Sequence, residues 1–329
     1  MTKKLFYFLC CFFMLNTHAM ALELKIGVLA PEGTNWANNM REMANKIKQE
    51  TNGAVTLRIY FGGAQGDEPD VLRKIRIGQL QGGVFTGKTL GDINGDVRVL
   101  EIPFTFEGDR AKGWNAVEAL SGQLNQGFTE RGFVNLGFFE LGMVYFVSQK
   151  ENPNLRSLQG LKIWQWEGDQ LVSTMIDTMG LVSVPLPLPD VLSSLSTGII
   201  EAAYGPPLGI LSLQWNTRVN YLVDFPIAYS VGAMLVDQRS WRRISEENRE
   251  KILNISNEYM AKINKANIQD NQDALTAMKS SGVKFLSFPE GDIEHGHTYR
   301  QKMIEKLRGK LFSKEIYQAL NSHLEAKSE

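Results

Sequence analysis

Hydrophobic and polar residues along the chain follow two patterns that alternate with each other. Residues 24–29 and 55–60 have an apolar residue at every second position or more often, which is typical of buried strands. Between them, residues 36–51 place apolar residues at three- and four-residue spacing, and Asn52-Gly53 is a helix stop signal. This order of strand, helix and strand predicts the start of an α/β fold.

The same order of elements continues along the chain. The pattern predicts a helix at 69–77, a strand at 83–86, strand-like alternation at 97–100, strands at 134–139 and 143–148, and a further strand at 161–164. Strands that alternate with helices predict mainly parallel sheets. Ligands of such sheets bind beyond the carboxyl ends of the strands, so we expect a site where these loops converge.

One helix is predicted to be much longer than the others. It begins at Ser245, a good N-cap, and extends to about Ser280, with Ile252 to Ala266 supplying one apolar stripe and Gly282 the stop. At about 1.5 Å per residue it would be roughly 50 Å long, enough to bridge two lobes. The segment from Glu294 to the end is rich in Lys and Glu and is expected to be a solvated terminal helix.

The first residues have the features of a signal peptide. Lys3 and Lys4 precede an apolar run over 5–15, and Ala19-Met20-Ala21 has the small residues of a cleavage site. The mature chain is therefore expected to begin near Leu22, after cleavage at Ala21. The apolar run is about half the roughly 20 residues that a membrane-spanning helix needs, so we expect an exported, periplasmic protein without a retained anchor.

Composition and charge narrow the class of protein further. Both cysteines, Cys10 and Cys11, lie in the signal peptide, so no disulfide is expected in the mature chain. Removal of 21 residues from 329 leaves 308, and the formal charge of −1 becomes −3 without Lys3 and Lys4. The length predicts about two domains, and the mixed charges give no reason to expect a nucleic-acid partner.

Residues Gly82 to Thr89 match the phosphate-loop pattern, in which two glycines are separated by four residues and followed by Lys and Thr. In a nucleotide site the strand precedes the glycines and the helix starts at the lysine. Here the apolar strand falls inside the motif, so we favour a chance match.

Metal binding and catalysis have little support. Asp292, His295 and His297 carry metal-ligand atoms, but a His-x-His pair in a polar segment is more often solvated. No Gly-x-Ser-x-Gly elbow is present, and the mature histidines, including His323, lie late in the chain. We expect a protein that is not an enzyme and has no cofactor or metal.

Aromatic residues are frequent near the predicted loop ends, namely Trp36, Trp164, Trp166, Tyr204 and Trp215. Core packing is the ordinary role of any one of them. Alternation, however, sends Trp164 and Trp166 to the same side of a strand, and Glu167 and Asp169 follow directly. We interpret this segment as the edge of a pocket.

Several segments in order resemble those of one family. They are 24–27, 51–53, 66–68, 72–80, 100–104, 158–162, 195–198 and the stretch from Trp241 through the long helix to 282–284. Together they resemble the substrate-binding subunit of tripartite ATP-independent periplasmic (TRAP) transporters, of the DctP type, over nearly all of the mature chain.

This resemblance implies an α/β fold with two lobes, a venus-flytrap arrangement of mainly parallel sheets joined by a long bridging helix. One lobe would comprise 22–142, about 231–270 and 298–329, and the other about 143–230 and 271–297. The resemblance also implies closure on a small molecule and delivery to integral membrane subunits, and we expect a monomer.

Three polar anchors of the family are absent. Trp164 stands where the family usually places a carboxylate-binding arginine, and Val144 stands where a second arginine is often found. The segment Glu201 to Pro206 has Gly205 in place of a ligand-facing asparagine. The chain is therefore identified as a variant that lacks the usual carboxylate clamp.

From these departures we expect a ligand that is more apolar or aromatic than a simple dicarboxylate. Its contacts would come from Trp36, Trp164, Trp166 and Tyr204, with polar contacts from Glu68, Thr86 and Glu167. An acidic pair without arginine would also admit a cation over an indole face. The alternative is that Lys88 or Arg218 binds a carboxylate.

Two other functions stay open on the sequence. A binding subunit of an efflux or sensing complex would share all these features. An exported α/β hydrolase would need a nucleophile and a base in the cleft, and turnover by the purified protein would distinguish it.

Overall fold

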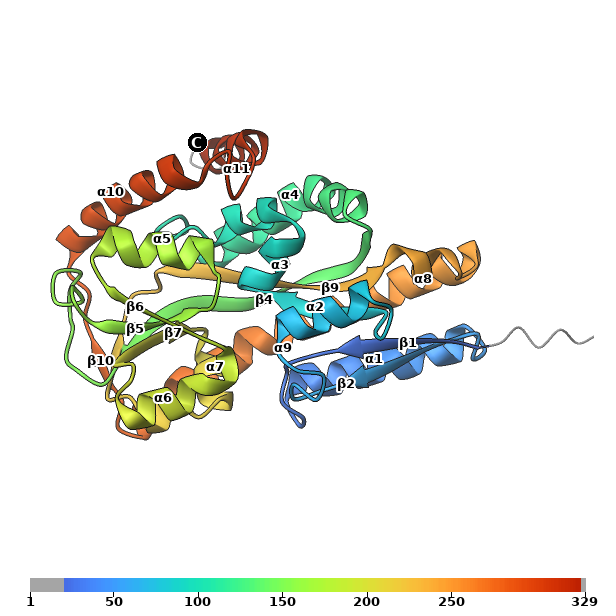
Figure 1. Ribbon diagram of the computed structural model, residues 1–329, viewed down its shortest axis with the longest axis horizontal. Helices are drawn as coiled ribbons and strands as arrows, with labels where there is room; N and C mark the ends of the chain where they lie inside the picture. Colours follow the sequence, from blue (N-terminus) through green and yellow to red (C-terminus); the bar gives the residue numbers. More distant parts are fainter. Residues whose placement is uncertain (1–20, 327–329) are drawn as a thin grey trace, which may run out of the picture.

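The computed structural model of the chain describes residues 21–326, as drawn in Figure 1. The predicted signal peptide therefore lies outside the described residues, except for Ala21. Within 21–326, no helix is long and apolar enough to span a membrane. Ten strands form one mixed sheet system in the order β2-β1-β3-β9-β4-β7-β5-β6, with β8 and β10 attached beside β4.

The first lobe is built on three parallel strands, β1 (Leu22–Gly27), β2 (Val55–Tyr60) and β3 (Gly82–Thr86), with helices α1 (Asn35–Glu50), α2 (Glu68–Arg76) and α3 (Gly87–Ile93). These elements confirm the predicted order. Helix α1 begins where the Thr34 hydroxyl accepts a hydrogen bond from the Ala37 N–H at 3.1 Å. Its apolar stripe, including Met40 and Ile47, is buried in the same core as Ile26 of β1.

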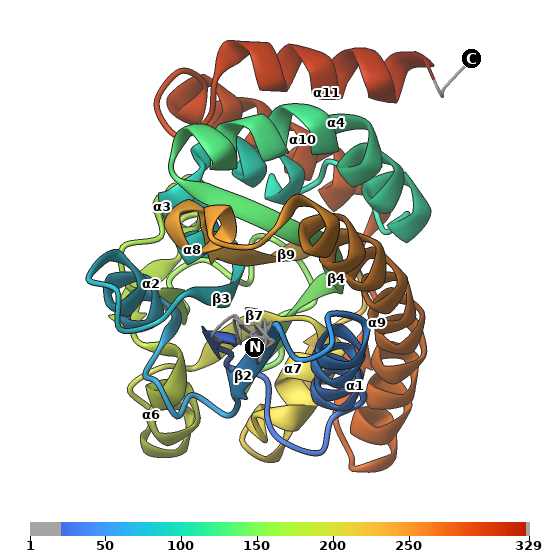
Figure 2. The same cartoon turned by 90° about the vertical axis from the view of Figure 1, so that its right-hand side faces the viewer.

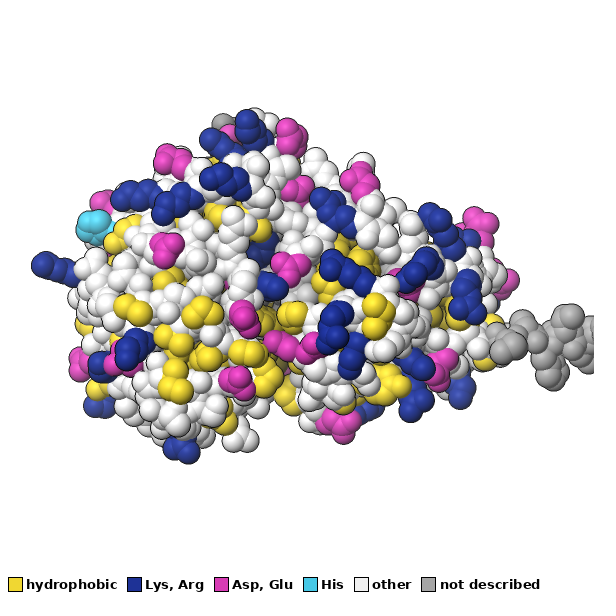
Figure 3. All heavy atoms as spheres, viewed as in Figure 1, with side chains coloured by type: hydrophobic (Ala, Val, Ile, Leu, Met, Phe, Trp, Pro, Cys, Tyr) yellow, Lys and Arg dark blue, Asp and Glu magenta, His cyan; other side chains and the backbone are white. Residues whose placement is uncertain are grey.

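The second lobe repeats the arrangement. Its parallel strands are β5 (Lys162–Trp166), β6 (Val182–Leu186) and β7 (Ala202–Gly205), with β8 (Tyr221–Val223) parallel to β10 (Lys284–Leu286), and its helices include α5 (Gln170–Met179), α6 (Val191–Thr197) and α7 (Pro207–Ser212). On the face of the molecule that Figure 3 shows, apolar side chains gather over α6 and neighbouring strands. Lys and Arg side chains on the same face are frequent over α2 and α8 (Gln238–Arg242).

Two long antiparallel strands join the lobes. The structure merges the predicted strands at 134–139 and 143–148 into one strand, β4 (Phe133–Ser148), which pairs with β9 (Ala228–Asp237). The register shifts twice, near Gly137 and Gly142, whose φ angles of 151° and 117° favour glycine. The predicted lobe boundaries near 142 and 231 fall inside these strands and stay a prediction.

Helix α9 (Glu246–Ser280) confirms the predicted bridge. Ser245 caps its start, and Ile252 and Ile263 lie in the core shared by β1 and α1. Near its other end, Met278 lies in the second-lobe core with Trp164 and Trp215. Figure 2 shows α9 running along one side of the molecule beside α1.

Two predicted elements were wrong. Residues 97–100 are not a strand but part of a 3₁₀ helix, Gly95–Glu101, because Asn94 caps it and Arg98 pairs with Glu101 one turn later. The segment after Glu294 is not one solvated helix: α10 (Glu290–Leu307) and α11 (Lys314–Ala326) follow each other and bury apolar side chains, which include Met303, Leu307, Ile316 and Leu320. Helix α11 packs on α4 (Arg110–Glu130), as Figure 1 also shows.

Candidate ligand-binding site

A cavity of about 220 Å³ lies between the two lobes. Its walls include the carboxyl ends of parallel strands from both lobes: Leu29 follows β1, Thr86 ends β3, Trp166 ends β5 and Gly205 ends β7. This is where parallel-sheet geometry places a ligand.

The structure brings most of the predicted site residues to this cavity. Those that line it are Trp36, Glu68, Thr86, Val144, Trp164, Trp166, Tyr204 and Gly205. Glu167 does not line it and is exposed, because β5 ends at Trp166 and the turn through Gly168 leaves Glu167 at the surface. Asp169, two residues later, lines the cavity instead.

Lys88 and Arg218, the two side chains considered as alternative partners for a ligand carboxylate, do not line the cavity. Lys88 is outside the cavity lining and its Nζ is 2.6 Å from Asp92 Oδ2. Arg218 is exposed and is likewise absent from the lining. Neither geometry supports binding of a ligand carboxylate in this cavity.

The second-lobe wall is a cluster of aromatic rings. Trp164 stacks on Tyr204 with ring centroids 5.0 Å apart, and Trp215 meets Trp164 edge-on at 5.3 Å. Trp166 lies 6.1 Å from Trp164, so the alternation along β5 places both indoles on the same side as predicted. Trp164 Nε1 donates to the Leu186 carbonyl at 3.0 Å, which leaves mainly ring surface for a ligand.

Glu68 and Thr86 form a closed pair on the first-lobe wall. The Glu68 carboxyl accepts hydrogen bonds from both the Thr86 N–H and the Thr86 hydroxyl, each at 2.8 Å. Glu68 is only 3% exposed, and burial raises the pKa of its carboxyl to about 8. At neutral pH this side chain is therefore predominantly uncharged.

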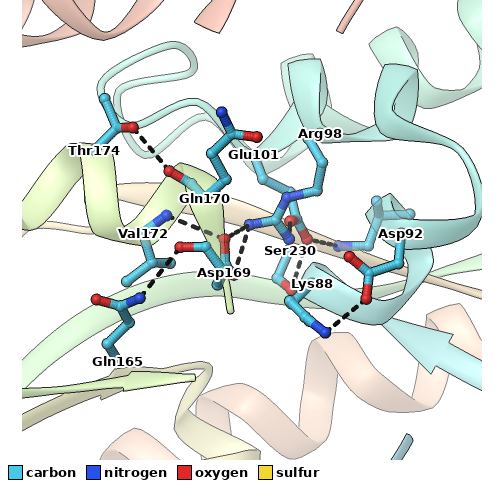
Figure 4. Close-up of polar contacts among 11 residues, drawn as sticks. Lys88, Asp92, Arg98, Glu101, Gln165, Asp169, Gln170, Val172, Thr174 and Ser230 are labelled. Carbon is cyan, nitrogen blue, oxygen red and sulfur yellow. Dashed lines mark hydrogen bonds and ion pairs between the residues drawn. The ribbon is translucent and has the colours of Figure 1, made fainter. Parts of the chain in front are cut away.

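The sequence reasoning missed a buried ionic cluster beside this pair. Arg98 Nη2 lies 2.9 Å from both carboxylate oxygens of Asp169, which belongs to the second lobe, and its Nη1 pairs with Glu101 (Figure 4). Glu101 also accepts hydrogen bonds from Ser230 and the Val231 N–H, and Asp169 Oδ1 accepts one from the Val172 N–H. Arg98 thus joins carboxylates from both lobes.

The positive charge of Arg98 is compensated within the protein. Burial opposes the charged form of Arg98, but Asp169 and Glu101 raise its pKa above the ordinary value, so the guanidinium stays charged. Burial also raises the pKa of Glu101, while Arg98 opposes that shift. Arg98 is the single Lys, Arg or His among the described residues that line the cavity.

A second contact crosses the cleft. Trp166 Nε1 donates to Asp67 Oδ2 at 3.2 Å, and the other oxygen of Asp67 accepts from the Glu68 N–H at the start of α2. Together with the pair between Arg98 and Asp169, this contact holds the lobes in a closed arrangement.

The phosphate-loop match and the late histidines are both explained by ordinary structure. Strand β3 occupies 82–86, inside the motif, as expected for a chance match. His297 Nε2 lies 2.7 Å from Glu107 Oε1. In the part of the chain that the structure describes, no three His, Cys, Asp or Glu side chains are grouped to hold a metal ion.

Comparison with known proteins decides the family. The profile of the bacterial extracellular solute-binding proteins, family 7 (DctP), matches residues 26–311. This chain belongs to that family. It is accordingly an extracellular solute-binding protein and not an enzyme, as the sequence resemblance implied.

Individual relatives are distant. A solute-binding protein of Chromohalobacter salexigens is 26% identical over 65% of this chain, and the match spans 63% of that relative, just under two thirds of its length.

Solved structures of TRAP periplasmic solute-binding proteins have the same fold as this solute-binding protein. That of Desulfovibrio salexigens with bound orotic acid has a TM-score of 0.84 at 20% identity, covering 92% of this chain and 98% of the other. That of Chromohalobacter salexigens with bound D-glucuronate has a TM-score of 0.82 at 19% identity, with coverage of 92% and 99%. At these identities the likeness establishes the two-lobed fold.

Proposed function

We propose that this protein captures a small, mainly apolar or aromatic organic molecule in the closed cleft and delivers it to the integral membrane subunits of a TRAP-type transporter for uptake. Arg98 is the one basic side chain on the described cavity wall, and it is paired with two protein carboxylates. This pairing is the observation that carries the proposal. A ligand carboxylate would therefore have to compete with Asp169 and Glu101 for it.

The balance of charge strengthens this argument. Glu101 and Asp169 line the cavity with Arg98, and Glu68, which is predominantly uncharged at neutral pH, adds a third carboxyl group to the lining. A small organic acid would meet more carboxyl groups than guanidinium groups there. Such a ligand would lose its hydration, and the cation it meets, Arg98, is already paired with protein carboxylates.

The aromatic wall supplies a favourable contribution to the free energy of ligand binding. Trp164, Trp166, Tyr204 and Trp215 give this wall an apolar, aromatic lining, and their rings are already held by contacts with each other. Rings that are fixed before binding lose little entropy when a planar ligand stacks on them. This arrangement favours an aromatic ligand over the acids orotate and D-glucuronate, which occupy the related structures.

Closure on the ligand and delivery to the membrane subunits are parts of the same proposal. Binding in a cavity whose walls come from both lobes favours the closed form, because only that form offers both walls at once. Membrane subunits that recognise the closed form would then receive loaded protein. We expect the binding protein to act as a monomer, which its mass in solution would test.

The proposal is tested by titration of the purified mature protein, followed by tryptophan fluorescence, with two panels of compounds. Indole and p-cresol represent neutral aromatic ligands, and succinate, D-glucuronate and orotate represent organic acids. Because four tryptophans line the cavity, binding should change their emission. We expect a neutral aromatic compound to bind at least about tenfold more tightly than any of the acids.

A matched pair of variants locates the binding. Trp164→Phe keeps an aromatic ring in the cavity but reduces its area. It should weaken the binding of the aromatic compounds by about fivefold or more. Trp114→Phe changes a tryptophan of α4 whose Nε1 donates to Glu118, outside the cavity, and should leave binding unchanged. Tighter binding of an organic acid than of either neutral compound would contradict the proposal.

A further inference from the structure

The turn between β5 and α5 touches the first lobe at three places. The Trp166 indole reaches the start of α2, and the Asp169 carboxylate holds Arg98 Nη2. Between these two contacts, a Cβ atom on Gly168 would come within 3.3 Å of Lys88 Cε, so the turn also packs against α3. The Asp169 N–H donates to the Trp166 carbonyl at 2.9 Å, which closes the turn. This turn is therefore the part of the second lobe that meets the first lobe when the cleft closes.

Arg98 is held in place by its own lobe. Its Nη1 pairs with Glu101, which in turn accepts hydrogen bonds from Ser230 at 3.2 Å and from the Val231 N–H at 3.3 Å. The stem of Arg98 lies on Gly91 of α3, where a Cβ atom would come within 2.7 Å of Arg98 Cγ and Cδ. Nη2 is the end of the guanidinium that is left for a partner from the second lobe.

Asp169 is likewise held in place by its own lobe. It is the N-cap of α5, and its Oδ1 accepts a hydrogen bond from the Val172 N–H at 3.1 Å. A carboxylate at a helix N-terminus is stabilised by the free N–H groups there. Each partner of the pair between Arg98 and Asp169 thus has its position without the other, and closure of the cleft joins them (Figure 4).

The pair has a consequence for an acidic ligand, because Arg98 and Asp169 both line the cavity. Separation of the lobes would part Asp169 from Arg98 Nη2 and leave Nη2 facing the open cleft. A ligand carboxylate bound there would occupy the position that Asp169 takes in the closed form. Closure would then bring two carboxylates together at one cationic N–H group, which is unfavourable in a buried site. A ligand without a carboxylate leaves the pair free to form.

We propose that Asp169 determines specificity as a built-in carboxylate, which closure places on Arg98 where a ligand carboxylate would bind, so that organic acids are excluded from the closed form. This inference rests on the proposed function and deepens it, since it assigns the rejection of acids to one residue. The rejection acts at closure, and the aromatic wall provides the attraction for the right ligand. Specificity of this kind combines a favourable contact with a repulsive one against the wrong ligand.

The test is a gain of acid binding in Asp169→Ser. Serine is also a good N-cap, so the start of α5 is kept while the carboxylate is removed and space opens beside Nη2. Three acids of increasing reach, benzoate, phenylacetate and 3-phenylpropionate, are compared with their primary amides by tryptophan fluorescence of the mature protein. In the wild type, each acid should bind at least about tenfold more weakly than its amide.

In Asp169→Ser, at least one acid should bind about tenfold or more tightly than it binds to the wild type, whereas the amides should change by less than about threefold. Small-angle X-ray scattering should give this variant, saturated with that acid, the radius of gyration of the wild type saturated with the amide. Asp169→Asn keeps the volume beside Nη2 filled and should show a smaller gain.

Asp109→Ser is the matched control. Asp109 is the N-cap of α4, accepts from the Lys112 N–H at 2.9 Å and lies outside the cavity lining. This variant should keep the wild-type ratio of acid to amide affinity. A gain of acid binding in Asp109→Ser equal to that in Asp169→Ser would overturn the inference, because loss of any negative charge would then suffice.

The outcomes separate the two proposals. If Asp169→Ser gains no affinity for any of the three acids, the role of Asp169 is overturned, and the preference for neutral ligands stands wherever the wild type still favours the amides. If the wild type binds an acid more tightly than its amide, the proposed function is overturned together with this inference. The gain is measured on the acids alone, so it decides the role of Asp169 even if the amides do not bind.

Discussion

The two walls of the cavity differ in how their functional groups are used. On the first-lobe wall, Glu68, Arg98 and Glu101 bond to other groups of the protein, and Arg98 reaches across to Asp169. On the second-lobe wall, the tryptophan and tyrosine rings contact each other and present mainly apolar area. The charged wall therefore organises and closes the site, whereas the aromatic wall supplies contact area for the ligand.

The largest expected effect comes from breaking the ionic cluster. Arg98→Met leaves Glu101 and Asp169 buried without their cation, which should lower the free energy of unfolding by about 3 to 5 kcal/mol. Urea denaturation at pH 7 measures this change. Lys251→Met removes a cation that pairs with Glu247 on the surface of α9 and should leave the unfolding midpoint nearly unchanged. Equal effects of the two substitutions would show that the charged wall is not held by Arg98.

A comparable effect, which depends on pH, is expected from Glu68. Its pKa is raised from 4.5 to about 8 by burial, so between these values the folded protein keeps a proton that the unfolded chain releases. The stabilising contribution is full below pH 4.5 and is lost as the pH rises toward about 8, with a slope of at most about 1.4 kcal/mol per pH unit. Glu68→Gln, which is always uncharged, should flatten this decrease in urea denaturation between pH 5 and pH 8. An unchanged pH profile in the variant would contradict the buried, protonated state of Glu68.

The smallest effect concerns the contact between Trp166 and Asp67. Trp166→Phe removes the indole N–H whose hydrogen bond crosses the cleft. This should destabilise the closed state by about 1 kcal/mol, which corresponds to roughly a fivefold loss of affinity for an aromatic ligand. Small-angle X-ray scattering of the ligand-free variant should show a larger radius of gyration than the wild type. Unchanged affinity and size would mean that this contact contributes nothing to closure.

Much of the fold could be predicted from the pattern of apolar residues. Strand β2 and the long helix α9 were predicted almost to the residue, because their spacing and stop signals are local. The 3₁₀ helix at Gly95–Glu101 could not be predicted in this way. Val97 and Val99 alternate as in a strand, whereas the conformation is set by the Asn94 cap and the partners of Arg98. The packing of α10 and α11 on the rest of the molecule is likewise a tertiary effect.

The site was predicted unevenly for a related reason. Tryptophans near loop ends and the departures from the family pattern were visible in the sequence. Arg98 was missed because its partner Asp169 is 71 residues away and in the other lobe. Asn267, a buried residue of α9 that lines the cavity, was also missed, although a signal existed: it follows Ile263 by four residues, so a polar side chain falls on the apolar stripe of the helix. Glu167 was misplaced because one turn residue decides whether a side chain faces the cavity.

The most direct test of the central claim is native mass spectrometry of the exported, mature protein, followed by denaturing extraction and identification of any small molecule that copurifies. The account predicts an uncharged aromatic or apolar compound, and its loss or weakening in Trp164→Ala. Recovery of a small dicarboxylate or a sugar acid would contradict it, and would mean that Arg98 exchanges Asp169 for the ligand.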